Sequence, residues 1–392
     1  MPVATQALSG TNPSRRATVS GRPCTVAVLS SAAEISQLDQ AVRRLMPDRD
    51  VALRPRFFLA TISAMWRPRV VVVSRGEAIL GLVYAQELEI AGVPTGLLYT
   101  DGRLNNLVVA DSIDQEEIIR VAIQALFALP RVRGLRFVIP PGGFEARAVA
   151  SIQSLVPLDI GYFSTSVHAR LPLPGTYEEF LQSLGYKTRR NFRYYRRKFE
   201  AAGHTYVENV SLLDVRHAAV ELQKKSRLRK KRLEIDWDLK VIAATDRPWA
   251  VGLRHRNGVW LSFAAGWHSA GRATMLFQLN NDREYGEASL SVVLRAHLIE
   301  ALIENGTPEL MFWSGCAPPL ARYVTNIPAI RVHLDTPTPG WRLMRAAIGV
   351  AQSHSSEWIA NKLTLIAGSE PSPKRPRSAL DLQIPAGPEL ND

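Results

Sequence analysis

The chain has 392 residues, of which 46% are hydrophobic and 21% are charged. This length allows two domains of ordinary size, and the composition is that of a soluble globular protein. No apolar run approaches the roughly 20 residues of a membrane-spanning helix, and the N-terminal residues lack the pattern of a signal peptide. Two cysteines, Cys24 and Cys316, are too few for a disulfide framework or a metal cluster. We therefore expect a cytoplasmic protein that binds no metal.

The net charge of +12 is unevenly placed along the chain. Residues 187–198 hold seven Lys or Arg, and residues 224–232 hold another seven, with no acid in either run. Removing these fourteen from the 48 basic residues leaves 34, against 36 acidic residues. The excess positive charge is therefore local, and it indicates an anionic partner at one surface.

In the first half, residues 1–23 are rich in Ser, Thr, Pro and Arg, and we expect them to be disordered. Hydrophobic periodicity then predicts two helices and an antiparallel meander. The predicted order is strand 25–29, helix 31–46, helix 57–66, strands 70–74, 78–89 and 95–100, helix 113–129, strand 135–139, helix 144–155 and strand 162–171.

The second half repeats this outline. Capping-box spacing at Thr176 and Glu179 starts a helix, and a basic helix follows from residue 187 to residue 202. The predicted elements after it are strand 205–210, helix 212–228, strands 249–254, 259–267 and 272–279, a loop and helix to about residue 302, strand 309–314, helix 318–324, strand 330–334 and helix 341–365. We expect a disordered N-terminal segment 1–23, domains at 24–172 and 173–366, and a disordered tail at 367–392.

Residues 274–302 carry the clearest functional pattern. Met275, Phe277 and Leu279 alternate like a strand with one buried face, and a turn containing Gly286 leads to a helix. A strand, a glycine turn and a helix N-terminus make an anion site, because backbone N–H groups point outward and the helix dipole adds positive charge. We expect a ligand that carries phosphate.

At this turn the chain resembles the GNAT acyltransferase superfamily. That family's coenzyme A loop reads Gln/Arg-x-x-Gly-x-Gly/Ala between a strand and a helix, and Arg283-x-x-Gly286-x-Ala288 fits it. The resemblance implies that the loop binds the pyrophosphate of acetyl-CoA or another acyl-CoA, with the N–H groups of Tyr285 to Ala288 as donors. The loop residues are Arg283, Glu284, Tyr285, Gly286, Glu287, Ala288 and Ser289. The alternative is a plain strand-to-helix turn that uses Gly286 for its conformational freedom.

Residues 177–184 and 187–203 are similar to the CelD/BcsL-type acetyltransferases of bacteria, a family tied to cellulose biosynthesis. Those proteins resemble the FemAB aminoacyltransferases in having two GNAT-like domains in tandem. The likeness covers residues 25–350, and it implies an α/β (α+β) fold in which each domain is a mixed, mostly antiparallel sheet flanked by helices. Residues 312–323 keep Gly315 but lack the family's acidic residues and lysine, so the substrate contacts made there in relatives do not transfer.

Three residues are candidates for acid–base chemistry. Tyr323 follows the next strand by a short helix, where many GNAT enzymes place the tyrosine that protonates the coenzyme A thiolate. Glu287 lies at the helix mouth, where the dipole stabilises a carboxylate whatever its task. His268 ends a predicted strand and is a candidate base, since imidazole titrates near neutrality. The alternatives are a half-buried tyrosine and a surface histidine without chemical roles.

The basic helix has two distinct faces. Phe192, Tyr195 and Phe199 share one face, which we expect to be core. The arginines beside it favour phosphate, because a guanidinium grips phosphate with two hydrogen bonds. They are Arg189, Arg190, Arg193, Arg196 and Arg197. Their ligand could be the 3′-phosphate of coenzyme A, an anionic or lipid-phosphate acceptor, or tRNA, and a merely solvated face is the remaining alternative.

The leading hypothesis is an acyltransferase that moves an acyl group, most simply acetyl, from acyl-CoA to an amine or hydroxyl of a small-molecule or glycan acceptor. The resemblance connects this activity with polysaccharide or cell-envelope biosynthesis, and we expect the acceptor between the two domains. One alternative is a FemAB-like transferase that uses aminoacyl-tRNA. A second is a GNAT-fold scaffold that binds anionic partners, and peripheral contact with a membrane is compatible with the basic runs.

Overall fold

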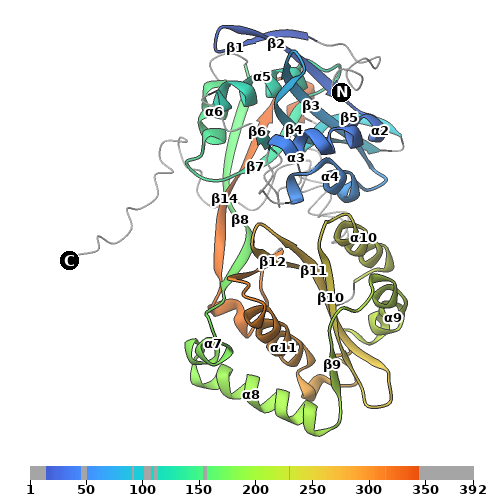
Figure 1. Cartoon of the computed structure of the whole chain (residues 1–392). Coiled ribbons are helices and arrows are strands. Elements are labelled where there is room, and N and C mark those ends of the chain that lie inside the picture. Colours follow the sequence, from blue (N-terminus) through green and yellow to red (C-terminus); the bar gives the residue numbers. More distant parts are fainter. Residues whose placement is uncertain are drawn as a thin grey trace, which may run out of the picture. The chain divides into compact units, whose positions relative to one another are not determined.

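The computed structural model describes residues 15–45, 51–90, 92–100, 107–109, 114–152, 157–228, 230–313 and 315–343. The chain forms two compact units (Figure 1). Unit 1 contains residues Met1–Pro47, Ile62–Ser166 and Pro328–Asp392, and unit 2 contains Asp48–Thr61 and Val167–Ile327. Most of the helix expected at 341–365, and the whole tail expected at 367–392, lie outside the described residues.

Unit 1 is built on a mixed sheet with the strand order β1-β2-β3-β4-β5-β7-β14-β8, and β6 pairs with β4. Pairing is antiparallel from β1 to β5, β7 runs parallel to β5, and β14 returns antiparallel to β7. The valines at 70–73 of β3 are fully buried, as expected for a central strand. The strands are β1 Arg15–Val19, β2 Arg22–Leu29, β3 Trp66–Arg75, β4 Ala78–Ile90, β5 Val93–Tyr99, β6 Leu107–Val109, β7 Gly134–Ile139, β8 Asp159–Pro172 and β14 Thr325–Asp335, and the helices are α2 Ala32–Gln37, α3 Asp39–Leu45, α5 Gln115–Phe127 and α6 Phe144–Ile152.

Unit 2 repeats this plan with the strand order β8-β13-β12-β11-β10-β9. The hairpins β10–β11 and β11–β12 are antiparallel, β13 runs parallel to β12, and β8 returns antiparallel to β13. The elements are η1 Val51–Leu53, α4 Pro55–Thr61, α7 Tyr177–Ser183, α8 Tyr186–Ala201, β9 Thr205–Val207, α9 Leu212–Lys225, α10 Arg232–Ala243, β10 Pro248–Arg254, β11 Trp260–Ser269, β12 Arg272–Asn280, η2 Gly286–Ala288, α11 Leu290–Glu304, β13 Glu309–Trp313 and η3 Leu320–Arg322.

Helices contact the sheet of unit 2 in two groups. Helix α11 packs on β10, β11 and β12, and α7 and α8 pack against α11, whereas α9 and α10 contact β11 and β12 and α10 also meets α4. Helix α11 is buried nearly all round, which its apolar sequence requires. Phe192 and Phe199 of α8 are buried in the same core, so the expected aromatic face of the basic helix is confirmed.

The boundary between the units falls inside β8 and β14, because the two halves exchange their last strands. Strand β8 ends the first half of the sequence, yet its residues from 168 to 172 pair with β13. Strand β14 ends the second half, yet its residues from 330 to 335 pair with β7. The expected division at residue 173 misses this exchange. The expected α/β class, with a mixed and mostly antiparallel sheet flanked by helices in each half, is confirmed.

Two local expectations differ from the structure. The segment 1–23 was expected to be disordered, but Arg15–Val19 forms β1 and pairs with β2 through a turn at Ser20 and Gly21, where both residues have positive φ. Burial of the Val19 side chain explains why this short polar stretch is ordered. Helix α10 was not expected, although Ile235, Leu239 and Ile242 show the helical spacing of a buried face.

None of the described helices combines the length and the apolar character needed to cross a bilayer.

Candidate functional site

Strand β12 carries a β-bulge at the point where its parallel partner leaves it. Phe277 pairs with Ala265 and Met275 pairs with Gly266, so Leu276 is the extra residue. Pairing with β13 covers only residues 273–275 of β12, although β12 continues to Asn280. Among the described residues, no strand therefore pairs with 276–280 on the β13 side, and we call this segment the open edge of β12. Bulges and unpaired edges commonly lie beside binding sites, because their backbone groups remain available to a ligand.

The predicted coenzyme loop begins directly after the open edge and ends at the N-terminus of α11. Two of its expected donors are already used, because the N–H of Tyr285 donates to the Asn281 carbonyl (3.2 Å) and the N–H of Ala288 donates to the Tyr285 carbonyl (2.9 Å). This internal bonding removes them from the expected donor set and leaves the N–H groups of Gly286 and Glu287 for an anion. The side chain of Glu287 is exposed, and Ser289 has a left-handed φ of 46° as the N-cap residue of α11.

Gly286 has no unusual backbone angle, and its near neighbour is the end of the Arg227 side chain. Its φ lies outside the left-handed region, so the alternative based on conformational freedom finds no support here. A Cβ at this position would lie 3.1 Å from Nη2 of Arg227. The Arg227 guanidinium therefore lies beside the exposed Gly286, and a larger side chain at this position would have to shift the end of Arg227.

The second basic run lies beside this loop. The N–H of Arg283 donates to the carbonyl of Lys225 (3.0 Å), and Nζ of Lys225 pairs with the Glu284 carboxylate (2.9 Å). Hydrogen bonds from Asn281 and Lys225 lower the pKa of Glu284. Glu284 therefore anchors the loop to the end of α9 and is committed to that task. Arg227 of the same run lies beside Gly286 in space. It was not among the site residues predicted from the sequence.

Arg295 of α11 hydrogen-bonds to both segments that separate at the Leu276 bulge, namely β12 and the residues after β13. Arg295 is only 6% exposed, and its Nε and Nη2 donate to Oε1 of Gln278 on β12 (3.2 and 3.0 Å). Its Nη1 donates to the carbonyl of Ala317, which follows β13 (3.0 Å). The hydrogen-bond partners are neutral, and burial lowers the pKa of the guanidinium. Arg295 and Gln278 thus fix the spacing between the open edge and the segment after β13. The sequence offered one indication of this pair, which is that Arg295 is a cation within an apolar helix.

Tyr323 lies at the N-terminus of α8. Its hydroxyl accepts the N–H of Gly185 (2.9 Å) and lies 3.4 Å from Oγ1 of Thr188. These two hydrogen bonds, led by the one with Thr188, lower the pKa of the phenol. Tyr323 therefore accepts the N–H of Gly185, the N-cap residue of α8, as the N3 side chain does in a capping box.

The loop and Tyr323 lie toward opposite ends of α8. Helix α8 contacts η2, and a chain of ring contacts with centroids 6.0, 4.4 and 5.1 Å apart joins Tyr285, His255, His204 and Phe199. Phe199 and Thr188 are eleven residues apart in the helix, which corresponds to about 16 Å at 1.5 Å per residue. Thr188, the partner of Tyr323, is therefore one helix end away from the ring contacts that lead to the loop.

The arginines of α8 do not form one binding face. Arg196 pairs with Glu200 (2.8 Å) and with Glu300 of α11 (2.7 Å), so its role is to join α8 to α11. Arg193 pairs with Glu178 (2.5 Å). The basic run itself contains no acid, but Arg193 and Arg196 have acidic partners outside it. Within the part of the chain that the structure describes, Arg189, Arg190 and Arg197 form no ion pair.

His268 lies away from the loop. It faces Ala273 beside the β11–β12 hairpin turn, whereas Ser262 faces Asn280 at the loop end of the same pair of strands. Six residues of strand separate these ends, or about 20 Å at 3.3 Å per residue. Burial and the charge of Arg247 lower the pKa of His268. His268 is therefore remote from the loop, although it lies only two residues from Gly266, which pairs with Met275 at the bulge.

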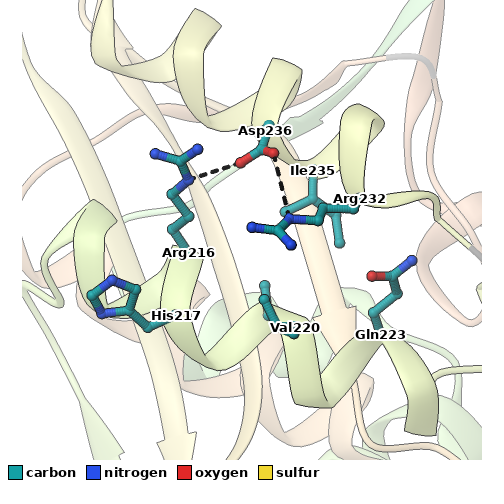
Figure 2. A pocket seen from close by; sticks show the side chains of 8 residues that line it. Arg216, His217, Val220, Gln223, Arg232, Ile235 and Asp236 are labelled. Atoms are coloured by element: carbon teal, nitrogen blue, oxygen red, sulfur yellow. Dashed lines mark hydrogen bonds and ion pairs between the residues drawn. The ribbon is translucent and has the colours of Figure 1, made fainter.

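A surface pocket of about 170 Å³ lies between α9 and α10 (Figure 2). Figure 2 shows Arg216 and Arg232 on either side of Asp236, with Val220 and Ile235 nearby. Nε of Arg216 lies 2.8 Å from one Asp236 oxygen, and Nε of Arg232 lies 4.0 Å from the other. Asp236 thus partly neutralises the two cations, and none of the predicted site residues lines this pocket. Among the described residues, no three His, Cys, Asp or Glu side chains are grouped as metal ligands.

No family model matches the sequence, and no curated protein matches it. Solved structures do match the fold. FemX aligns with a TM-score of 0.54 and 11% identity over 78% of this chain and 96% of its own. A conserved protein of unknown function from Bacteroides thetaiotaomicron aligns with a TM-score of 0.51 and 10% identity, covering 83% and 100% of the two chains.

The C-terminal domain of a protein described as a lysylphosphatidylglycerol synthetase, from Agrobacterium fabrum, aligns with a TM-score of 0.50 and 13% identity over 81% of this chain and 97% of that one. At such identities the likeness shows the fold alone. The fold of this chain is therefore similar to that of FemX and of this synthetase domain.

Proposed function

We propose that the protein is an acyltransferase that takes an acyl group from acyl-CoA and transfers it to an amine or hydroxyl acceptor. The observation that carries this proposal is the open edge of β12, which begins at the Leu276 bulge and leads into the loop at 283–289. An arm that contains amides can hydrogen-bond to such an edge as an added strand would. A phosphate group at its other end would reach the loop and the N-terminus of α11.

The residues around the loop fit a phosphorylated ligand. The N–H groups of Gly286 and Glu287 and the Arg227 guanidinium would hold the pyrophosphate, because charge-assisted hydrogen bonds to phosphate are strong. Gly286 permits the close approach that such a contact requires. Bound acyl-CoA would supply an activated thioester, so the protein has mainly to position the reactants and to handle protons.

Tyr323 is the proposed proton donor to the departing sulfur. The hydrogen bonds from Gly185 and with Thr188 favour the phenolate, which makes the phenol a stronger acid than an unperturbed tyrosine. Glu287 is exposed at η2, so we assign it a contribution to the electrostatic potential of the loop and not the role of general base. The similarity of residues 177–203 to CelD/BcsL-type acetyltransferases supports acetyl as the acyl group, a glycan as the acceptor and a cytoplasmic reaction in polysaccharide or envelope biosynthesis.

Ligand-dependent thermal shifts of the full chain test this function. Acetyl-CoA should raise the melting temperature of the wild-type protein, because a ligand that binds only the folded state stabilises it. Gly286→Trp should abolish the shift, since the added side chain meets Arg227 at the loop. Arg227→Gln should weaken it, whereas the matched change Arg216→Gln, in the pocket between α9 and α10, should leave it unchanged. No shift of the wild-type protein at millimolar acetyl-CoA would reject the proposal.

A second candidate is transfer from aminoacyl-tRNA, which the fold likeness to FemX favours. The basic run beside the loop would then contact RNA phosphates. In that case tRNA binding should fall steeply with salt, with a slope of about 0.7–0.9 per neutralised phosphate, and acetyl-CoA should give no thermal shift. A protein that binds neither donor would correspond to the scaffold alternative.

A further inference from the structure

Helix α8 presents an outward face that combines exposed tyrosines with basic residues. Tyr186 is 71% exposed and Tyr194 is 49% exposed, although tyrosine rings are usually at least half-buried. They are eight residues apart, so they lie on one side of the helix, opposite the buried Phe192 and Phe199. The face consists of Tyr186, Lys187, Arg190, Tyr194, Arg197 and Lys198. In Figure 1, α8 lies along one side of unit 2, with α11 on its inner side.

The cations of this outward face differ from those on the flanks of α8. Arg193 and Arg196 are held by carboxylates of Glu178, Glu200 and Glu300. Within the described ranges, Lys187, Arg190, Arg197 and Lys198 form no ion pair. All four are exposed, and they follow one another along a helix of 16 residues. Like charges so close together repel one another, so an anionic partner that covers them relieves an unfavourable arrangement.

The spacing of the tyrosines decides which anionic partner fits. Eight residues of helix place Tyr186 and Tyr194 about 12 Å apart along its axis. Neighbouring bases of a nucleic acid strand lie about 3.4 Å apart, so the two rings cannot stack on successive bases. A lipid surface imposes no such spacing, because both rings and all four cations can meet one plane. Tyrosine rings with basic residues are also suited to the boundary between headgroups and acyl chains.

We propose that the outward face of α8 docks the protein on an anionic lipid membrane, with the tyrosine rings among the headgroups and the four cations on lipid phosphates. This contact is independent of the loop and of the proposed acyl-CoA chemistry. It would bring unit 2 to a membrane by electrostatic attraction that acts only within about 8 Å at physiological salt.

Co-sedimentation of the full chain with vesicles tests the docking surface. Vesicles of equal parts phosphatidylglycerol and phosphatidylcholine should bind the protein, and pure phosphatidylcholine vesicles should not. Replacing two cations, in Arg190→Gln/Arg197→Gln, should weaken partitioning about 30-fold, since each cation near an anionic surface contributes about a fivefold change. The double variant Tyr186→Ser/Tyr194→Ser should also weaken it without changing net charge.

The matched control is Arg216→Gln/Arg232→Gln, which removes the same charge from exposed positions on α9 and α10. It should retain vesicle binding. Equal losses in the control and in the α8 variants would reduce the effect to net charge and would overturn the proposal, as would failure to bind phosphatidylglycerol. Binding of poly(U) RNA that is lost in the α8 variants, without vesicle binding, would assign the face to nucleic acid instead.

Discussion

His297 provides a pH-dependent test of how α8 and α11 pack. It lies on α11, is 8% exposed, and stacks on Tyr206 with ring centroids 4.8 Å apart and planes within 9°. Its Nε2 lies 3.7 Å from the Glu200 carboxylate. Burial, together with the charge of Arg196, lowers its pKa to about 4, although Glu200 and Glu300 act in the opposite direction. The neutral ring is therefore the form that the folded chain accepts.

The sign of the effect follows from proton linkage. A histidine in the unfolded chain titrates near 6.5, so between pH 6.5 and pH 4 the unfolded state binds the proton and the folded state does not. The contribution of His297 to stability is present above pH 6.5 and is lost as the pH falls through this window. For a folded pKa of about 4, the loss between pH 7 and pH 5 is about 2 kcal/mol.

The substitution His297→Phe keeps an aromatic ring and removes the titration. Urea unfolding at pH 7 and pH 5 measures the difference, with tryptophan fluorescence as the signal because five of the eight tryptophans lie in unit 2. The wild-type protein should lose about 2 kcal/mol more than the variant over this range. An equal loss in both proteins would show that His297 is not held neutral at the interface of α8 and α11, and would refute this view of their packing.

Three substitutions test the structural roles assigned to side chains on and beside α8. Arg196→Gln should lower the free energy of unfolding by about 1–2 kcal/mol, because it removes the pairs with Glu200 and Glu300. Arg190→Gln should change it by less than about 0.5 kcal/mol. Equal effects of the two substitutions in urea unfolding would contradict the structural role of Arg196. Tyr323→Phe should cost about 1 kcal/mol in the same assay, because the Gly185 N–H loses its acceptor at the N-terminus of α8, and an unchanged stability would leave Tyr323 without this role.

The order of the elements could be predicted because local patterns determine it. Alternating apolar residues marked β10 to β12, and the capping box of Thr176 and Glu179 marked α7, whose two reciprocal hydrogen bonds are present. The exchange of β8 and β14 between the units could not be predicted in this way. Nothing in the 14 residues of β8 says which strand will pair with its second half, since that choice depends on contacts distant in sequence.

Helix α10 was missed for a different reason. Its N-cap position is Lys231, which is not a preferred N-cap residue, and the adjoining basic run obscured the start. The capping-box partner Glu234 was present in the sequence. The basic residues before the helix therefore hid its start, although the helical spacing of Ile235, Leu239 and Ile242 indicated it correctly.

The candidate site was predictable as a loop but not as a network. Its glycine turn followed from a short motif. Arg227 comes from a segment more than fifty residues away, and the pairing of Arg295 with Gln278 depends on how α11 packs on β12. A single sequence also cannot show that Arg196 pairs with Glu300, more than a hundred residues away, so it was grouped with cations that are free to bind phosphate. His268 shows the same limit, because strand register decides which end of a hairpin a residue occupies.

Amide hydrogen exchange with and without acetyl-CoA would locate the coenzyme contact on the backbone. We expect slower exchange at residues 276–280 of the open edge and at residues 286–291, which span η2 and the start of α11, with little change at the β11–β12 hairpin turn near His268. Exchange that is unchanged along β12, or slowed only in other elements, would contradict an acyl-CoA site at the open edge.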